Sequence, residues 1–188
     1  ILLDLGVDGL TLSVSRGSFT QVNPAGNRAL ILALLANSGL RQTDRIIECY
    51  SGVGNLSIPL ASRVCSVISI EQDKNAVLDA QDNIARLGIT NIECIRAGVE
   101  KGLEILVARG EEADAVVLDP PRHGAAAILP YLKEMEIRKV VYVSCNPSTL
   151  ARDLRYLEKV GYRTKIVQPI DLFPQTYHIE TVAVAVLT

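Results

Sequence analysis

Short β-branched and aliphatic runs alternate with helical stretches from Asp44 onward, and this alternation constrains the fold more than any other feature. Strands that alternate with helices build a parallel sheet covered on both faces. The runs expected to form strands span residues 45–48, 64–70, 92–95, 115–118 and 140–143. The sequence therefore predicts an α/β domain with a mostly parallel sheet.

Helix signals stand between and before these runs. Asp73 is a suitable N-cap for a helix that reaches Leu87, with apolar residues on one face and Gly88 after its end. Asn23 and Asn146 are each followed by proline, the combination of cap and first-turn residue that begins a helix. We expect two further helices to start there.

The C-terminal end breaks the alternation. Residues 162–170 and 179–187 are both strand-like, and only the loop 171–178 separates them. Strands joined so closely pair antiparallel. A parallel sheet that closes with such a hairpin resembles the Rossmann-like sheet of class I S-adenosylmethionine-dependent methyltransferases rather than an ordinary dinucleotide-binding sheet.

The length of 188 residues suits one domain of moderate size. Residues 1–18 are rich in Gly and Ser with alternating Leu10, Leu12 and Val14, and are expected to be a strand pair left over from a preceding domain. The first residue is Ile1 rather than Met, so we expect the chain to be an excised piece. Residues 19–188 are expected to form the catalytic domain. Apolar runs are shorter than the ~18 residues of a spanning helix, and no signal segment opens the chain, which predicts a cytoplasmic protein without a membrane partner.

Charge and cysteine content narrow the function classes. Lys and Arg number 19 against 21 acids, so no global basic field marks a non-specific nucleic-acid binder. Residues 1–118 hold 10 basic and 14 acidic side chains, net −4, whereas residues 119–188 hold 9 and 7, net +2, so a polyanion is expected on the second part. The four cysteines form no C-x-x-C pair and have no histidines at metal-ligand spacing, which predicts reduced thiols and no metal.

The turn after the first predicted strand is the expected ligand site of such a sheet. Gly52 and Gly54 let the backbone approach a ligand, and Asn55 follows them. Glu71 ends the second predicted strand, where an acid accepts both hydroxyls of a ribose. Because Ser57 replaces the third glycine of a dinucleotide fingerprint, the pattern suits S-adenosylmethionine or NAD, with a ligand-free turn and a solvated acid as the alternative.

Asp119 follows the fourth predicted strand and precedes Pro120, Pro121 and Arg122. Two prolines end a strand and hold the acid and carbonyls stiffly toward the crevice. An NAD enzyme has no obvious need for them, whereas methyltransferases acting on a planar nitrogen or carbon often carry a proline pair there. His123 comes next and is expected to be an ordinary surface residue.

Cys145 lies between the end of the fifth predicted strand and the start of a helix. The positive end of the helix dipole favours a thiolate, so this cysteine is the candidate nucleophile. Cys49, Cys65 and Cys94 lie in or beside apolar strands and are expected to be small buried hydrophobes.

With these residues in place, the chain resembles the RNA uracil-5-methyltransferases, which form 5-methyluridine in tRNA and ribosomal RNA. Five motifs carry the resemblance: SFTQVN at 18–23, YSGVGN at 50–55, DPPR at 119–122, SCNP at 144–147 and FPQTYHIE at 173–180. It implies a Cys145 nucleophile and a Glu180 proton acceptor. It also implies S-adenosylmethionine contacts, which together with the glycine turn are expected at Gln21, Tyr50, Gly52, Asn55, Glu71 and Asp119.

The chemistry calls for the same residue types. Carbon 5 of uracil is a poor nucleophile until a soft thiolate adds at carbon 6, and a base must later remove the carbon 5 proton. Glu180 shares strand parity with Val182, Val184 and Val186, so we expect it on an apolar face, where burial raises a carboxyl pKa.

The resemblance is incomplete. Relatives often carry an acid or amide for the adenine where Gly98 stands, and full-length members add an OB-like RNA-binding domain, some with an iron–sulfur cluster. The expected RNA substrate, ribosomal or transfer RNA, presents a flipped-out uridine, with Arg122, Arg152 and Arg155 as candidate contacts. The alternatives are a cofactor-binding module inactive without its RNA-binding domain and an RNA cytosine-5 methyltransferase.

Overall fold

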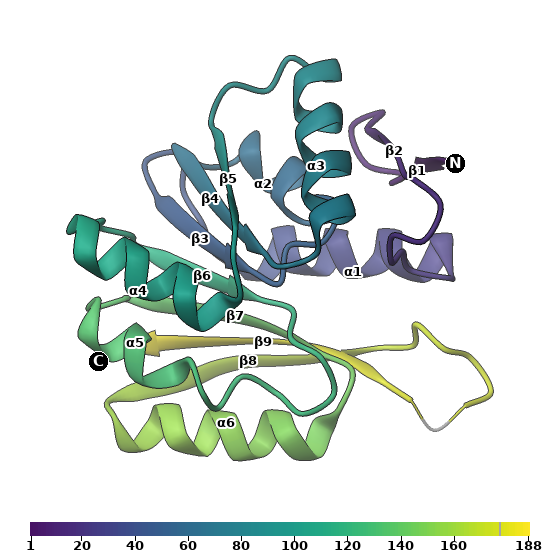
Figure 1. Ribbon diagram of the computed structural model, residues 1–188. Helices are drawn as coiled ribbons and strands as arrows, with labels where there is room; N and C mark the ends of the chain where they lie inside the picture. The colour runs from purple at the N-terminus through teal and green to yellow at the C-terminus, as the bar shows by residue number, and fades with distance from the viewer. Residues whose placement is uncertain (177) are drawn as a thin grey trace.

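The computed structural model describes residues 1–176 and 178–188, so Tyr177 of the closing motif lies outside the described residues. A seven-stranded sheet in the order β5-β4-β3-β6-β7-β9-β8 forms the centre, with helices on both faces (Figure 1). The strands are β1 (Leu2–Asp4), β2 (Thr11–Ser13), β3 (Arg45–Cys49), β4 (Ser66–Glu71), β5 (Ile92–Arg96), β6 (Ala115–Leu118), β7 (Lys139–Ser144), β8 (Tyr162–Ile170) and β9 (Glu180–Leu187). The helices are α1 (Pro24–Asn37), α2 (Ser57–Ala61), α3 (Lys74–Arg86), α4 (Val99–Arg109), α5 (Leu129–Glu134) and α6 (Pro147–Lys159).

The pairing of the strands confirms the predicted sheet. Strand β3 pairs parallel with β4 and β6, β4 pairs parallel with β5, and β6 with β7. Strand β9 is inserted between β7 and β8 and runs antiparallel to both. The sheet is therefore parallel up to β7 and ends in the expected antiparallel hairpin.

The expected helix caps are also confirmed. The Asn23 side chain accepts from the Gly26 amide, and the Asp73 side chain accepts from the Ala76 amide. The Asn146 carboxamide oxygen accepts from the amides that follow Pro147, at Ser148 and Thr149. Each cap satisfies an amide that the first helical turn leaves without a partner.

Apolar side chains fill the space on both faces of the sheet, which explains why the parallel strands read as continuous hydrophobic runs. On one face Ile46 and Val67 pack in a cluster with Leu30 of α1. On the other face Ile47 and Ile68 pack with the residues of α4, α5 and α6. No helix in the described part of the chain is long and apolar enough to cross a membrane.

The cysteine environments differ in one case from the expectation. Cys49 is buried and Cys94 is half-buried, but Cys65 is exposed, so its expected burial is wrong. Cys65 precedes β4 rather than belonging to it, in the turn where its amide donates to the Asp44 carbonyl. Among the described residues, no group of three potential ligands is placed to hold a metal ion.

The expected strand pair in residues 1–18 is present as the β1/β2 hairpin, which lies beside α3 (Figure 1). Its Leu5, Leu12 and Val14 are buried in the same cluster as Leu30. The fully buried Asn83 of α3 accepts from the Ser13 amide at 2.7 Å and donates to the Ser13 carbonyl at 2.9 Å. The hairpin thus shares the domain's core, and its origin in a preceding domain stays a prediction.

We expect Asn83→Ala to lower the free energy of unfolding by about 1–3 kcal/mol, because it leaves a backbone donor and acceptor of β2 without partners. Denaturant unfolding measures the change. The neighbouring exposed Asp82→Ala is the control and should be close to neutral. Equal stability of the Asn83 variant and the wild type would show that the hairpin does not depend on this contact.

Candidate active site

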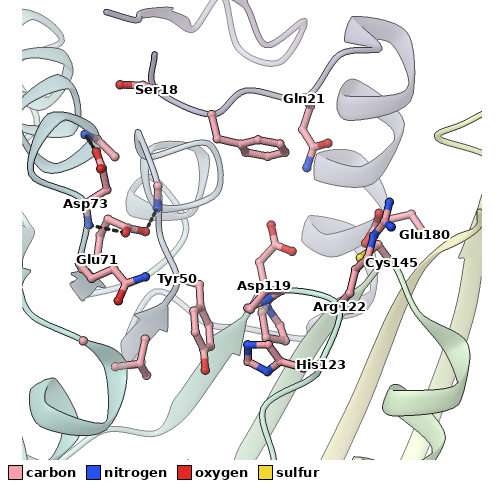
Figure 2. A pocket seen from close by; sticks show the side chains of 18 of the residues that line it. Ser18, Gln21, Tyr50, Glu71, Asp73, Asp119, Arg122, His123, Cys145 and Glu180 are labelled. Atoms are coloured by element: carbon pink, nitrogen blue, oxygen red, sulfur yellow. Dashed lines mark hydrogen bonds between the residues drawn. The ribbon is translucent and has the colours of Figure 1, made fainter.

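A cavity of about 1060 Å³ opens at the carboxyl edge of the parallel strands. It is at the upper end of the ~300–1,000 Å³ typical of small-molecule sites, so it has room for a cofactor and part of a second ligand. Segments after β3, β6 and β7, the end of β4 and the start of β9 contribute its walls, and residues 17–22 cover it from the N-terminal side (Figure 2). The strands' carboxyl ends thus converge where the sequence predicts a site.

The glycine turn and Glu71 form one unit at this edge. The Gly52 amide donates to Glu71 Oε2 at 2.9 Å, and the Asp73 amide donates to Oε1 at 2.8 Å, as Figure 2 shows. Two backbone donors therefore fix the orientation of a carboxylate that also lines the cavity. This geometry argues against a freely solvated acid.

Tyr50 begins the turn with a φ of 65°, a backbone conformation that residues other than glycine rarely adopt. The Tyr50 and Ser51 amides both donate to the Ile70 carbonyl at the end of β4, which holds the backbone there. Strain of this kind concentrates at functional sites. Tyr50 lines the cavity below Asp119, where Figure 2 shows both side chains.

Asn55 takes a different place from the other expected cofactor residues. Its carboxamide exchanges two hydrogen bonds with Asn27 of α1, at 2.8 and 2.9 Å. It lines a smaller neighbouring cavity of about 270 Å³, whereas Gln21 and Gly52 line both cavities. The Asn55 side chain thus ties the glycine turn to α1.

Acidic residues give this edge its electrostatic character. Burial raises the pKa of Asp119 to about 7. Burial also raises the pKa of Glu48, at the end of β3, to about 8, although the Ser57 hydroxyl donates to it and opposes the shift. With these raised pKa values both carboxyl groups are protonated over part of the neutral pH range, so they can donate as well as accept hydrogen bonds. Glu48 is not among the residues that the sequence singled out for this edge. An acid inside an otherwise apolar strand was the signal that could have identified it.

Cys145 and Glu180 both line the far side of the cavity, beside Arg122 (Figure 2). Glu180 is the first residue of β9 and is 3% exposed, and burial, with Asp119 nearby, raises its pKa to about 8. This confirms the expected burial of Glu180.

Cys145 differs from the expectation of a favoured thiolate. Burial raises the pKa of its thiol, Glu180 and Asp119 raise it further, and Arg122 lowers it only in part. Burial and two carboxyl groups therefore outweigh the helix start. Cys145, Glu180 and Arg122 all line the same cavity.

The remaining expected residues divide between the cavity and the surface. Arg122 and His123 line the cavity, and so do Gly98 and the loop residues Phe173 and His178. Arg152 forms an ion pair with Asp153, and Arg155 is exposed on α6; neither lines the cavity.

Comparison with known proteins identifies the family of this chain. The sequence model of the family described as tRNA (Uracil-5-)-methyltransferase matches residues 4–186. An uncharacterized RNA methyltransferase of Caldanaerobacter subterraneus is 42% identical over 94% of this chain and 39% of its own length. The 23S rRNA (uracil(1939)-C(5))-methyltransferase RlmD of Aeromonas salmonicida is 37% identical over 94% of this chain and 40% of its own length. The chain spans about two fifths of the length of these relatives.

Solved structures of methyltransferases are also similar to this chain. Pyrococcus abyssi tRNA (uracil-54, C5)-methyltransferase, in complex with S-adenosyl-L-homocysteine, superposes with a TM-score of 0.83 at 32% identity, covering 99% of this chain and 44% of that one. A precorrin-6y C5,15-methyltransferase of Geobacter metallireducens, 14% identical, shares the fold with a TM-score of 0.73 over 94% of each chain. The fold is that of the class I methyltransferases, and the chain belongs to the tRNA (uracil-5-)-methyltransferase family.

Proposed function

We propose that this chain is the catalytic domain of an RNA uracil-5-methyltransferase, which transfers a methyl group from S-adenosylmethionine to carbon 5 of a uridine in ribosomal or transfer RNA. The observation that carries the proposal is that a thiol, Cys145, and a buried acid, Glu180, face the same cavity as the glycine turn and Glu71. The relatives named for uracil methylation of 23S rRNA and of tRNA support it.

The cavity fits S-adenosylmethionine. Glu71 accepts two backbone hydrogen bonds and keeps lone pairs for ribose hydroxyls, and Asp119 lines the same cavity as a further hydrogen-bonding group. When bound, the cofactor supplies an electrophilic methyl group and leaves as S-adenosylhomocysteine. NAD suits this edge less well, because Ser57 occupies the third glycine position and its hydroxyl is bound to Glu48.

Cys145 and Glu180 divide the chemistry of the uracil ring. The Cys145 thiolate forms a bond to carbon 6, and the electrons of the 5,6 double bond move onto the O4 enolate, which makes carbon 5 nucleophilic. After carbon 5 has gained its methyl group, Glu180 accepts the proton on that carbon. The double bond then reforms, and the bond between sulfur and carbon 6 breaks.

RNA is the proposed macromolecular partner, with the target uridine flipped out of the stack, because neither reacting carbon is accessible inside a helix. Arg122 at the cavity and the exposed Arg155 are proposed RNA contacts. The rival cytosine-5 reaction is disfavoured, because Cys145 is the only cysteine among the described residues that line the cavity, and Arg122 and His123 occupy the loop where such enzymes typically carry a second one.

Glu71→Ala removes the proposed ribose acceptor and should weaken S-adenosylmethionine binding by about 1–3 kcal/mol, the range for a hydrogen bond to a charged group. Isothermal titration calorimetry with S-adenosylmethionine, S-adenosylhomocysteine and NAD measures it. Glu112→Ala, an exposed acid outside the cavity, is the control. NAD binding as strong as that of S-adenosylmethionine would contradict the cofactor assignment.

Cys145→Ala should leave S-adenosylmethionine binding intact but abolish both methylation and any covalent RNA adduct, because no thiolate remains to add at carbon 6. Denaturing gels of the full-length enzyme with 5-fluorouridine RNA and cofactor detect the adduct as a shifted band. Cys65→Ala is the matched control, because that thiol is exposed and lies outside the cavity. A shifted band with the Cys145 variant would assign the nucleophile elsewhere.

Glu180→Gln should still form the adduct with unmodified RNA but release methylated product slowly, so the adduct accumulates. In the wild type the base acts only when ionised. With a pKa of about 8, release from a preformed adduct should accelerate as pH rises toward 8 and level off above it. Samples of the preformed adduct are quenched at successive times across this pH range, and the loss of the shifted band gives the rate of product release. Normal turnover by the Glu180→Gln variant would refute the role of Glu180 as the base.

A further inference from the structure

We propose that Asp153 and Arg152 of α6 are positioning residues, which hold the loop 121–125 against the start of α6 and so fix Arg122 relative to Cys145. The loop follows β6 and carries Arg122 into the cavity, whereas Cys145 ends the segment after β7. The effect on the reaction rests on the proposed function; the attachment of the loop does not.

Asp153 joins three elements through one carboxylate. It is 1% exposed, and its Oδ2 accepts from the Ala125 amide at 2.8 Å and from the Tyr142 hydroxyl at 2.7 Å. Its Oδ1 accepts from Arg152 Nε at 2.8 Å. A buried carboxylate is tolerated when donors satisfy it in this way, and its removal leaves each donor without a partner.

Arg152 extends the same attachment to the loop backbone. Its Nη2 donates to the His123 carbonyl at 2.8 Å and lies 2.8 Å from Asp153 Oδ1. Gly124, with a φ of 81°, lies against this pair, since a Cβ there would come within 2.6 Å of both Arg152 Nη2 and Asp153 Oδ2. The loop therefore fits the pair only with a glycine at this position.

A second set of contacts connects the loop to the residue after the nucleophile. The Arg122 carbonyl accepts from Asn146 Nδ2 and from Thr149 Oγ1, each at 3.2 Å. Asn146 directly follows Cys145, so the backbone of Arg122 and that of Cys145 are linked through one side chain. The Asp153 and Arg152 contacts hold the following part of the loop, at His123 and Ala125, against α6.

These contacts distinguish Arg152 from an RNA contact. Its guanidinium already binds a buried carboxylate and a backbone carbonyl, a forked geometry that lysine does not reproduce. Arg155 lies on the same helix, is exposed and has no ion pair among the described residues. Arg155 is therefore free for phosphate, whereas Arg152 is held by the loop.

The test compares Asp153→Asn and Arg152→Ala in the full-length enzyme. The Arg152 side chain is half exposed, so we expect its replacement to disturb the packing of the core less than replacement of the buried Asp153 does. Matched controls are Asp44→Asn and Arg41→Ala, because Arg41 Nε lies 3.0 Å from the buried Asp44 before β3, at the edge of the sheet opposite the cavity. Hydrogen exchange of residues 119–126, cofactor affinity, RNA affinity and the rate of adduct formation are measured.

Both variants should exchange faster in residues 119–126 and form the adduct about 10–100-fold more slowly at saturating RNA and cofactor, as expected when a side chain that orients the substrate beside Cys145 is misplaced. Cofactor affinity should match the wild type, and any loss of RNA affinity through the displaced Arg122 should be equal in the two variants. The two controls should change neither loop exchange nor adduct formation. A merely structural role would alter exchange across the sheet as well.

Three results would overturn the proposal: unchanged loop exchange, unchanged adduct formation despite a loosened loop, or weaker RNA binding with a smaller salt slope in Arg152→Ala but not in Asp153→Asn. The last result would assign Arg152 to a phosphate. A wild-type enzyme that forms no adduct contradicts the proposed function instead. Loop exchange then still decides whether Asp153 and Arg152 hold the loop.

Discussion

The insertion of β9 between β7 and β8 is the constraint on which the arrangement of the site depends. Because β9 runs antiparallel to β7, with Thr181 opposite Ser144, its first residue lies at the carboxyl edge where β7 ends. Glu180 and Cys145 therefore line the same cavity although they are 35 positions apart in the chain. A parallel final strand would place its first residue at the opposite edge, away from the nucleophile.

Electrostatics at this edge follow from the same burial. Carboxyl groups of Glu48, Asp119 and Glu180 lie in or beside a well-packed sheet, and burial raises the pKa of each. At the same edge, two backbone amides donate to the Glu71 carboxylate and fix its orientation. One edge of the sheet thus combines Glu71, whose carboxylate is oriented by hydrogen bonds, with Glu180, whose pKa suits proton transfer near neutral pH.

The segment before α1 completes the cavity from a third direction. Asp79 of α3 accepts from the Ser15 amide and from both the Ser15 and Ser18 hydroxyls, which holds the chain that leads to Gln21. Asn23 caps α1 and also donates to the Leu172 carbonyl at 2.9 Å, in the loop before β9. Asp79 of α3 and Asn23 before α1 therefore hold two segments beside the cavity: the chain that leads to Gln21 and the loop that leads to Glu180.

The sequence by itself determined the strand and helix alternation, the caps and the C-terminal hairpin, because periodicity and capping act between residues close in the chain. It also placed Glu71, Asp119 and Cys145 at strand ends, and parallel strands bring such ends to one edge. Only the tertiary structure decided that Asn55 pairs with Asn27, that Cys65 is exposed and that Arg152 binds a loop carbonyl. The Asn55 and Arg152 contacts join residues that are 28 and 29 positions apart in the chain, so the local sequence pattern does not specify them. The exposure of Cys65 depends on where β4 begins, which the local pattern does not specify either. The raised pKa of Cys145 has the same origin, since burial and the carboxyls of Glu180 and Asp119 reach it only after the sheet has assembled.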